Sequence, residues 1–177
     1  MTAVLIPPER AALVPEVKPL RKLRLPAVTD HVLHNGLRVV AARRAAVPRV
    51  EVRLLVPTGR GGSAADAAAA RVLACTLLSG TESRTSTDLA EALQHMGATL
   101  DVHADAEDLV VSGSALAGSL DDLLDLVAEV LSRPTFPRAE VALERDRLVQ
   151  EISLARSQPA TVAREALLAR LFGRHPY

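Results

Sequence analysis

The stretch from residue 98 to residue 116 most constrains the fold, because apolar and polar side chains alternate along it. Leu100, Val102 and Ala104, and later Leu109 and Val111, recur at every second position. A period of two is typical of strands that bury one face, so this stretch predicts two half-buried antiparallel strands. The apolar face of such strands needs a covering layer, and the sequence on both sides has the signals of helices.

The first predicted helix covers residues 67–81 (AAAARVLACTLLSGT), which are apolar on almost every helical face. Ser63 and Asp66 resemble a capping box that opens it, and Gly80 is expected to end it. One arginine and the only cysteine of the chain interrupt the apolar run.

Four further helices are predicted. One begins at Thr85, with Asp88 completing its start signal, and ends at Gly97. Pro134 ends an amphipathic helix after the strands, Pro137 opens a longer one, and a last helix covers about 161–171. The expected buried side of the amphipathic helix consists of Leu120, Leu123, Leu124, Val127, Val130 and Leu131.

The amino-terminal third adds strands. Asn35-Gly36 lies between two short extended runs and predicts a hairpin, because both turn positions must accept a positive φ. Residues 50–57 predict a further strand. The order is therefore strands, two helices, two strands and three helices, which predicts an α+β fold with an antiparallel sheet layered against helices. Five prolines before residue 27 predict an extended arm over 1–29, followed by one domain over 30–177.

Composition excludes several function classes. The net charge is zero with both signs interspersed, and only three aromatic residues occur, so no nucleic-acid surface is expected. The first residues do not have the pattern of a secretory leader, no stretch predicts a membrane span, and the single cysteine cannot form an internal disulfide. We therefore expect a cytoplasmic protein, and the richness in arginine and alanine suggests a GC-rich bacterial genome.

Five features, in this order, resemble the first domain of the M16 metallopeptidases, the group of mitochondrial processing peptidase and insulin-degrading enzyme. They are LHNGLRVV, the glycine-rich turn into an apolar helix, the run from LLSGTESRTSTDLAEALQHMG to VVSGSAL, FPRAEVALERDRLVQEI and the final FGRHPY. The similarity extends from about Leu33 to the last residue. Family members continue past the H-P-Y segment and carry a second domain, so the resemblance implies a first domain that is incomplete at its carboxyl end.

The resemblance also assigns positions to a zinc site. In the family, the apolar helix carries an H-x-x-E-H motif shortly before a G-T dipeptide. Placing Gly80-Thr81 on that dipeptide puts Arg71 and Cys75 at the two histidine positions and Ala74 at the position of the general base. The third ligand of the family, a glutamate, corresponds to Glu151, and another family glutamate corresponds to Glu144, two helical turns earlier.

These substitutions predict a chain that is not catalytic. Catalytic zinc needs three protein ligands, a bound water and a base that takes the proton from this water. Ala74 cannot act as a base, and the permanent positive charge of Arg71 repels a cation. We therefore expect no metal and no other cofactor in this chain, with zinc present only in a partner subunit.

The same residues also have simpler interpretations. Glu144 and Glu151 fit the charged face of an amphipathic helix, with Arg147 placed to pair with Glu151. Cys75 fits an inert small apolar side chain, and a nucleophilic Cys75 has no nearby histidine to support it. None of the histidines has the spacing of a metal ligand, and these are His31, His34, His95, His103 and His175.

The resemblance implies an inactive M16-like subunit that forms a heterodimer with an active zinc-peptidase subunit and helps to bind peptide. Active relatives add a substrate strand to an edge strand that corresponds here to Leu100, Asp101, Val102, His103 and Ala104. The alternative is a structural protein that keeps the fold without handling peptide. No nucleic-acid or membrane partner is expected.

Arg71 has a specific predicted role within this interpretation. Without the metal, Glu144 and Glu151 lose a compensating charge, which is costly for partly buried carboxylates. A guanidinium can replace the metal by hydrogen bonding to a carboxylate through two nitrogens. We therefore expect Arg71 within hydrogen-bonding distance of Glu151 or Glu144, holding the two helices together. In the alternative, Arg71 extends from the helix edge into solvent.

Overall fold

The computed structural model describes residues 25–44, 46–58, 64–105 and 107–173. Most of the predicted proline-rich arm therefore lies outside the described residues, as does Ser63 of the predicted capping box. The chain divides into two compact units, with the division between Val47 and Pro48. The predicted domain boundary after residue 29 stays a prediction.

The first unit contains a hairpin of strands β1 (Val28–Val32) and β2 (Arg38–Ala42), which pair in antiparallel register. The Asn35-Gly36 prediction of a hairpin is confirmed, but the expected turn type is wrong. Only Gly36 has a positive φ, of 86°, and its amide donates to the carbonyl of Leu33 across 2.9 Å. The connection is a type I turn followed by a left-handed glycine, in which the asparagine keeps an ordinary backbone conformation.

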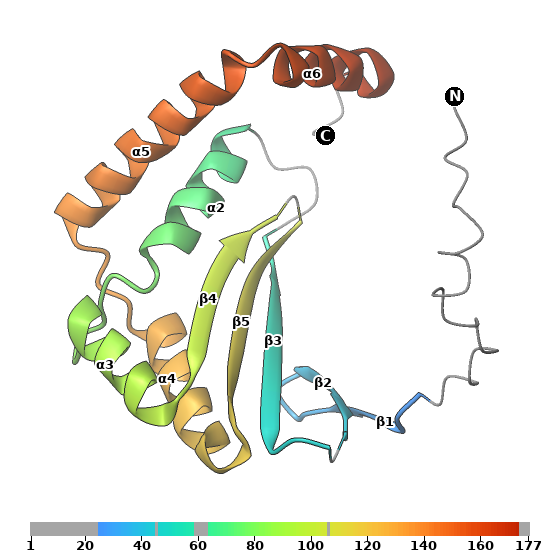
Figure 1. Cartoon of the computed structure of the whole chain (residues 1–177), viewed down its shortest axis with the longest axis vertical. Coiled ribbons are helices and arrows are strands. Elements are labelled where there is room, and N and C mark those ends of the chain that lie inside the picture. Colours follow the sequence, from blue (N-terminus) through green and yellow to red (C-terminus); the bar gives the residue numbers. More distant parts are fainter. Residues whose placement is uncertain (1–24, 45, 59–63, 106, 174–177) are drawn as a thin grey trace, which may run out of the picture. The chain divides into compact units, whose positions relative to one another are not determined.

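The second unit is built on a three-stranded antiparallel sheet in the order β3-β5-β4 (Figure 1). Its strands are β3 (Arg49–Pro57), β4 (Thr99–Ala104) and β5 (Asp108–Leu116). The two strands predicted from the alternating pattern are therefore confirmed as β4 and β5, and they are hydrogen-bonded neighbours. β5 is the central strand because it can bury Leu109, Val110 and Val111 against neighbours on both sides.

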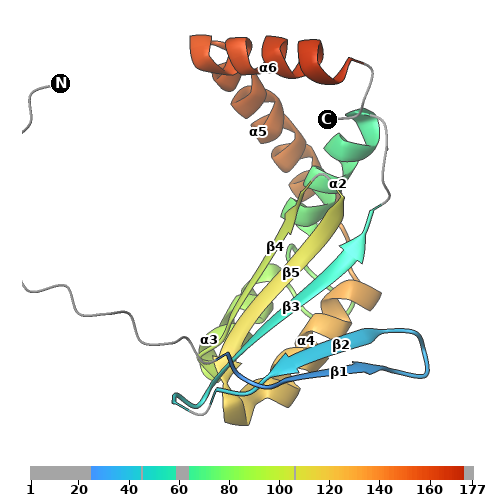
Figure 2. The ribbon, with the colours of Figure 1, turned by 90° about the vertical axis from the view of Figure 1, so that its right-hand side faces the viewer.

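Helices α3 (Ser86–Met96) and α4 (Leu120–Ser132) cover one face of this sheet, and a short 3₁₀ turn, η1 (Ala117–Ser119), leads into α4 (Figure 2). Leu123 of α4 is completely buried against Val111 and Ala115 of β5. The opposite face of the sheet carries the polar members of the alternating pattern, because neighbouring residues of a strand point to opposite sides. This arrangement confirms the predicted α+β layering.

The buried side of α4 differs from the prediction at two positions. Leu124 is 42% exposed, whereas Leu126, which was not predicted, is only 2% exposed. The reason is that α4 packs against two neighbours. Leu123 and Val127 contact the sheet core, while Leu126 belongs to a cluster that contains Leu89 of α3. The buried face of α4 therefore points between the sheet and α3, which buries Leu126 in place of Leu124.

The caps of α3 are those predicted. Thr85 accepts a hydrogen bond from the amide of Asp88, and the Asp88 carboxylate accepts one from the amide of Thr85 across 2.8 Å, which together form a capping box. Gly97 ends the helix in the left-handed conformation at a φ of 59°. Both ends of α3 are thus set by residues adjacent to it in the chain.

Helix α2 (Ala64–Thr76) ends four residues before the predicted stop. The Thr76 hydroxyl donates to the Val72 carbonyl across 2.8 Å, and the Ser79 amide donates to the Thr76 carbonyl, so the chain turns at this point. Gly80 instead forms an isolated β-bridge with Thr85. The turn is favourable because it places Leu77 in the core, where it is 3% exposed, together with Leu89.

Two helices complete the described chain, α5 (Arg138–Arg156) and α6 (Pro159–Phe172). Pro137 is the N-cap of α5, as predicted, and Pro159 occupies the first turn of α6, where its missing amide costs nothing. Both views show α5 running beside α2, with which it is in contact (Figures 1 and 2). No helix among the described residues has the length and apolar character needed to cross a bilayer.

Candidate functional site

The resemblance placed a lost zinc site on the two helices α2 and α5, and these helices are neighbours. Arg71 Nη2 of α2 lies 3.3 Å from Glu151 Oε1 of α5, close enough for a hydrogen bond within an ion pair. The side chains are 48% and 58% exposed. The predicted hydrogen bond between Arg71 and Glu151 is therefore confirmed, and it joins residues 80 positions apart.

Ala74 and Cys75 differ in their surroundings. Ala74 is 5% exposed, so its methyl group is part of the contact between α2 and the rest of the unit. Cys75 is a free, exposed thiol one helical turn after Arg71. Arg71 and Cys75 therefore share the side of α2 on which Arg71 meets Glu151.

Glu144 belongs to a separate contact. Its side chain is 18% exposed and lies 3.6 Å from Arg147 of the same helix. The predicted pairing of Arg147 with Glu151 is wrong, because Glu151 pairs with Arg71 of the neighbouring helix and Arg147 turns back to Glu144. An ion pair between i and i+3 forms as easily as one between i and i+4, so spacing alone did not decide the partner.

Zinc does not fit the residues at these positions. No group of three His, Cys, Asp or Glu side chains in the described ranges is arranged to hold a metal ion. The thiol of Cys75 and the carboxylate of Glu151 are too few for a catalytic zinc, which requires three protein ligands. The guanidinium of Arg71 already hydrogen-bonds to Glu151 and would repel a cation there.

The predicted peptide-binding strand is β4. The sheet order places it at one edge, so within the described part of the chain it pairs with β5 alone. Leu100, Val102 and Ala104 are half-buried, whereas Asp101 and His103 are exposed on the opposite face. Helix α2 contacts β4, so the edge and the Arg71 position belong to the same region of the unit. Peptide binding at this edge remains a prediction.

A carboxylate that was not predicted connects the segment after α2 to α4. Glu129 Oε1 accepts hydrogen bonds from the hydroxyls of Thr81 and Ser83, across 2.6 and 2.5 Å, and Arg84 Nε lies 3.5 Å from Oε2. The hydrogen bonds from Ser83 and Thr81 are the main reason why the pKa of Glu129 lies below its usual value. In the sequence, Glu129 is indistinguishable from the other acidic residues on the polar face of α4.

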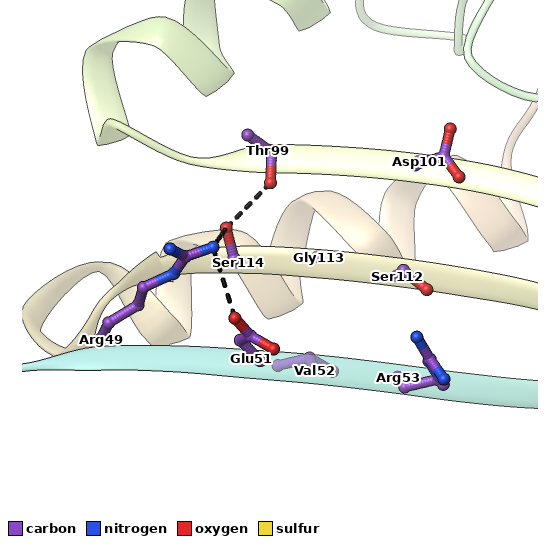
Figure 3. Close-up of a pocket in the computed structure, with 9 residues that line it drawn as sticks. All are labelled: Arg49, Glu51, Val52, Arg53, Thr99, Asp101, Ser112, Gly113 and Ser114. Carbon is purple, nitrogen blue, oxygen red and sulfur yellow. Dashed lines mark hydrogen bonds and ion pairs between the residues drawn. The ribbon is translucent and has the colours of Figure 1, made fainter. Parts of the chain in front are cut away.

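The polar face of the sheet forms a shallow, open pocket of about 460 Å³ (Figure 3). Its polar lining comes from alternate positions of all three strands, which are Arg49, Glu51, Arg53, Thr99, Asp101, Ser112 and Ser114. Only Asp101 was predicted as a site residue. The alternation was predicted only for residues 98–116, and the sequence did not indicate that three strands would place these polar side chains side by side.

Comparisons with known proteins identify the family of the chain. The family model described as insulinase, peptidase family M16, matches residues 38–177. An uncharacterized zinc protease of Mycobacterium leprae is 33% identical over 154 residues, which cover 86% of this chain and 35% of that protein. The beta subunit of the mitochondrial-processing peptidase of Rattus norvegicus is 27% identical over 131 residues, which cover 73% of this chain and 27% of that protein.

A crystal structure described as a peptidase M16 inactive domain from Pseudomonas fluorescens matches the fold. The TM-score is 0.78 at 24% sequence identity, over 85% of this chain and 37% of that one. The chain thus spans about a third of the length of these relatives. The family model, the curated relatives and the fold together show that the chain belongs to peptidase family M16.

Proposed function

We propose that this chain is a non-catalytic M16 domain, which associates with an active M16 subunit and helps to bind an extended peptide. The observation that carries the proposal is the hydrogen bond between Arg71 and Glu151. These residues occupy two of the positions that the resemblance assigns to zinc ligands, and a permanent cation there takes up the carboxylate that the metal would need.

The absence of a base supports the same conclusion. Ala74 occupies the position of the general base, and its methyl group cannot accept a proton from water. A reaction that depends on an activated water therefore needs residues from another subunit. The Pseudomonas fluorescens protein with this fold is described as an inactive domain, and the rat relative is one subunit of a processing peptidase. Both descriptions fit a division of labour between catalytic and non-catalytic M16 domains.

The peptide-binding part of the proposal depends on β4. Its outer edge presents backbone N–H and C=O groups with no strand partner among the described residues. An extended peptide can add to such an edge as a further strand, and the main-chain hydrogen bonds then provide affinity for many sequences. The exposed side chains of Asp101 and His103, whose Oδ2 and Nδ1 atoms lie 3.4 Å apart, would flank the added strand.

The test is to isolate the tagged chain from its native host and to identify the proteins that copurify with it. We expect an M16 subunit with an intact H-x-x-E-H motif. Hydrolysis of a fluorogenic peptide should be absent for the chain alone and should appear with this subunit. Hydrolysis by the chain alone that a chelator blocks would contradict the proposal. Copurification with a membrane complex, without peptidase activity, would instead favour a scaffold role.

A further inference from the structure

The pocket on the polar face of the sheet contains two cross-strand rows with different hydrogen bonding. In the first row, Glu51, Ser114 and Thr99 lie side by side on β3, β5 and β4. Arg49 Nη2 lies 3.3 Å from Glu51 Oε1 and donates to Ser114 Oγ across 3.2 Å, and Ser114 and Thr99 share a hydrogen bond of 2.9 Å (Figure 3). The polar groups of this row therefore satisfy one another.

The second row consists of Arg53, Ser112 and Asp101, which are paired across the same strands. Ser112 Oγ is buried and has no hydrogen-bond partner in the described structure. Arg53 likewise makes no hydrogen bond or ion pair with any residue of the described ranges. Figure 3 shows Ser112 between Arg53 and Asp101, with dashed contacts only in the neighbouring row. An exposed guanidinium and a buried, unpartnered hydroxyl are thus cross-strand neighbours in one pocket.

The chemistry of these two groups selects a hydrogen-bond acceptor with negative charge. A guanidinium can only donate, and the Ser112 hydroxyl can donate to the same acceptor. A buried polar group without a partner is costly, so a ligand that satisfies Ser112 gains more than one that only pairs with an exposed arginine. A cationic ligand would be repelled by Arg53.

The remaining charges of the pocket limit this acceptor to a single negative charge. The carboxylate of Glu51 is paired with Arg49, but Asp101 lies on the other side of Ser112 and, among the described residues, pairs only with His103, at 3.4 Å. A doubly charged phosphate would meet this carboxylate as well as the guanidinium. A carboxylate carries one charge and matches the planar donor geometry of arginine.

We propose that Arg53 and Ser112 form a subsite for one carboxylate group of a bound peptide, an inference that rests on the peptide-binding function proposed above. The row that contains them begins at Asp101 on the edge strand β4. A peptide held at that edge extends alternate side chains over the same face of the sheet. The subsite therefore selects among peptides that the backbone of β4 by itself would bind equally.

The experiment measures the affinity of the chain for short, fluorescently labelled peptides with blocked termini, by fluorescence anisotropy. One peptide contains a single central glutamate, and its matched control contains glutamine at that position. We expect the glutamate peptide to bind about tenfold more tightly, the effect typical of a hydrogen bond to a charged group, and this advantage to shrink as salt is added. Arg53→Met should remove the difference, and Ser112→Ala should reduce it.

Arg145→Met is the matched control, because Arg145 is an exposed arginine of α5 whose removal changes the net charge by the same amount. It should leave the preference for glutamate unchanged.

Equal binding of both peptides to the natural chain would overturn the subsite while leaving peptide binding intact. No binding of either peptide would overturn both. Two further probes identify the source of the carboxylate. One is a third peptide, with glutamine and a free terminal carboxylate, and the other is free acetate as a competitor. Acetate that competes as well as the glutamate peptide would overturn the assignment to peptides.

Discussion

Arg71 of α2 hydrogen-bonds to Glu151 of α5 across 3.3 Å, and so joins two helices at positions where the M16 resemblance expects two ligands of one metal ion. The pair is half exposed, so its strength is limited by solvent. The pair matters more for the chemistry of the site than for stability, because the Glu151 carboxylate already has the permanent cation of Arg71 as its partner.

The strength of this pair can be measured with Arg71→Ala, Glu151→Gln and the double variant. Exposed ion pairs typically contribute 0.2–1 kcal/mol, and we expect a coupling free energy of about 0.5 kcal/mol from urea unfolding. The exposed pair of Arg145 and Asp146, which are neighbours in one helix, provides a control cycle that does not connect two helices. A coupling free energy of zero would show that Arg71 does not hold α2 and α5 together.

Metal analysis tests the loss of the zinc site. We expect no stoichiometric zinc in the dialysed natural chain at neutral pH. The variant with both Arg71→His and Cys75→His should bind about one zinc, because two imidazoles one helical turn apart and Glu151 then provide three ligands. Adding Glu151→Gln to this variant should weaken the binding. One zinc per natural chain after dialysis would contradict the prediction.

The hydroxyls bonded to Glu129 predict a pH-dependent contribution to stability. The pKa of Glu129 is lower in the folded chain than in the unfolded chain, so the contribution is present above the unfolded pKa, near 4.5, and is lost as the pH falls through the folded pKa. Glu129→Gln should lower the free energy of unfolding at pH 7 by about 1–2 kcal/mol, since the two hydroxyls lose a charged acceptor. The difference from the natural chain should shrink at about pH 3.

This comparison must be made as a difference between variant and natural chain, because hydrogen bonds also lower the pKa of Asp88 and Asp105. Both carboxylates therefore add their own loss of stability in acid. A destabilisation by Glu129→Gln that is the same at pH 7 and pH 3 would show that the charge of Glu129 is unimportant.

The buried face of α4 is tested by two leucines that are adjacent in the chain. Leu123 is completely buried and Leu124 is 42% exposed. Leu123→Ala leaves a cavity against the sheet and should destabilise by about 2–5 kcal/mol, whereas Leu124→Ala should cost under about 1 kcal/mol. Thermal or urea unfolding of the two variants measures the contrast, and equal losses would contradict the observed orientation of α4.

Much of the fold follows from signals that act within a few residues. The alternating pattern over 98–116 predicted β4 and β5, since a strand must place alternate side chains on opposite faces. Thr85, Asp88 and Gly97 predicted both ends of α3, because a cap is formed by residues adjacent to the helix. The order of strands and helices was predicted for the same reason.

Features that depend on which elements become neighbours were predicted less well. No sequence signal favoured Leu126 over Leu124 in the core, because the choice depends on α4 packing against a sheet and a helix together. The sequence also did not show that α2 would end at Thr76, where a turn places Leu77 in that same core.

The candidate site divides in the same way. The sequence, through the family resemblance, predicted that Arg71, Ala74 and Cys75 do not form a catalytic zinc site, since ligand chemistry depends on residue type. Only the tertiary structure decided that Glu151 pairs with Arg71 instead of Arg147, and that Arg53 and Ser112 lie together on the sheet. The physical reason is that the side chains in these pairs lie far apart in the sequence, and no local interaction fixes their distance until the helices pack and the strands align.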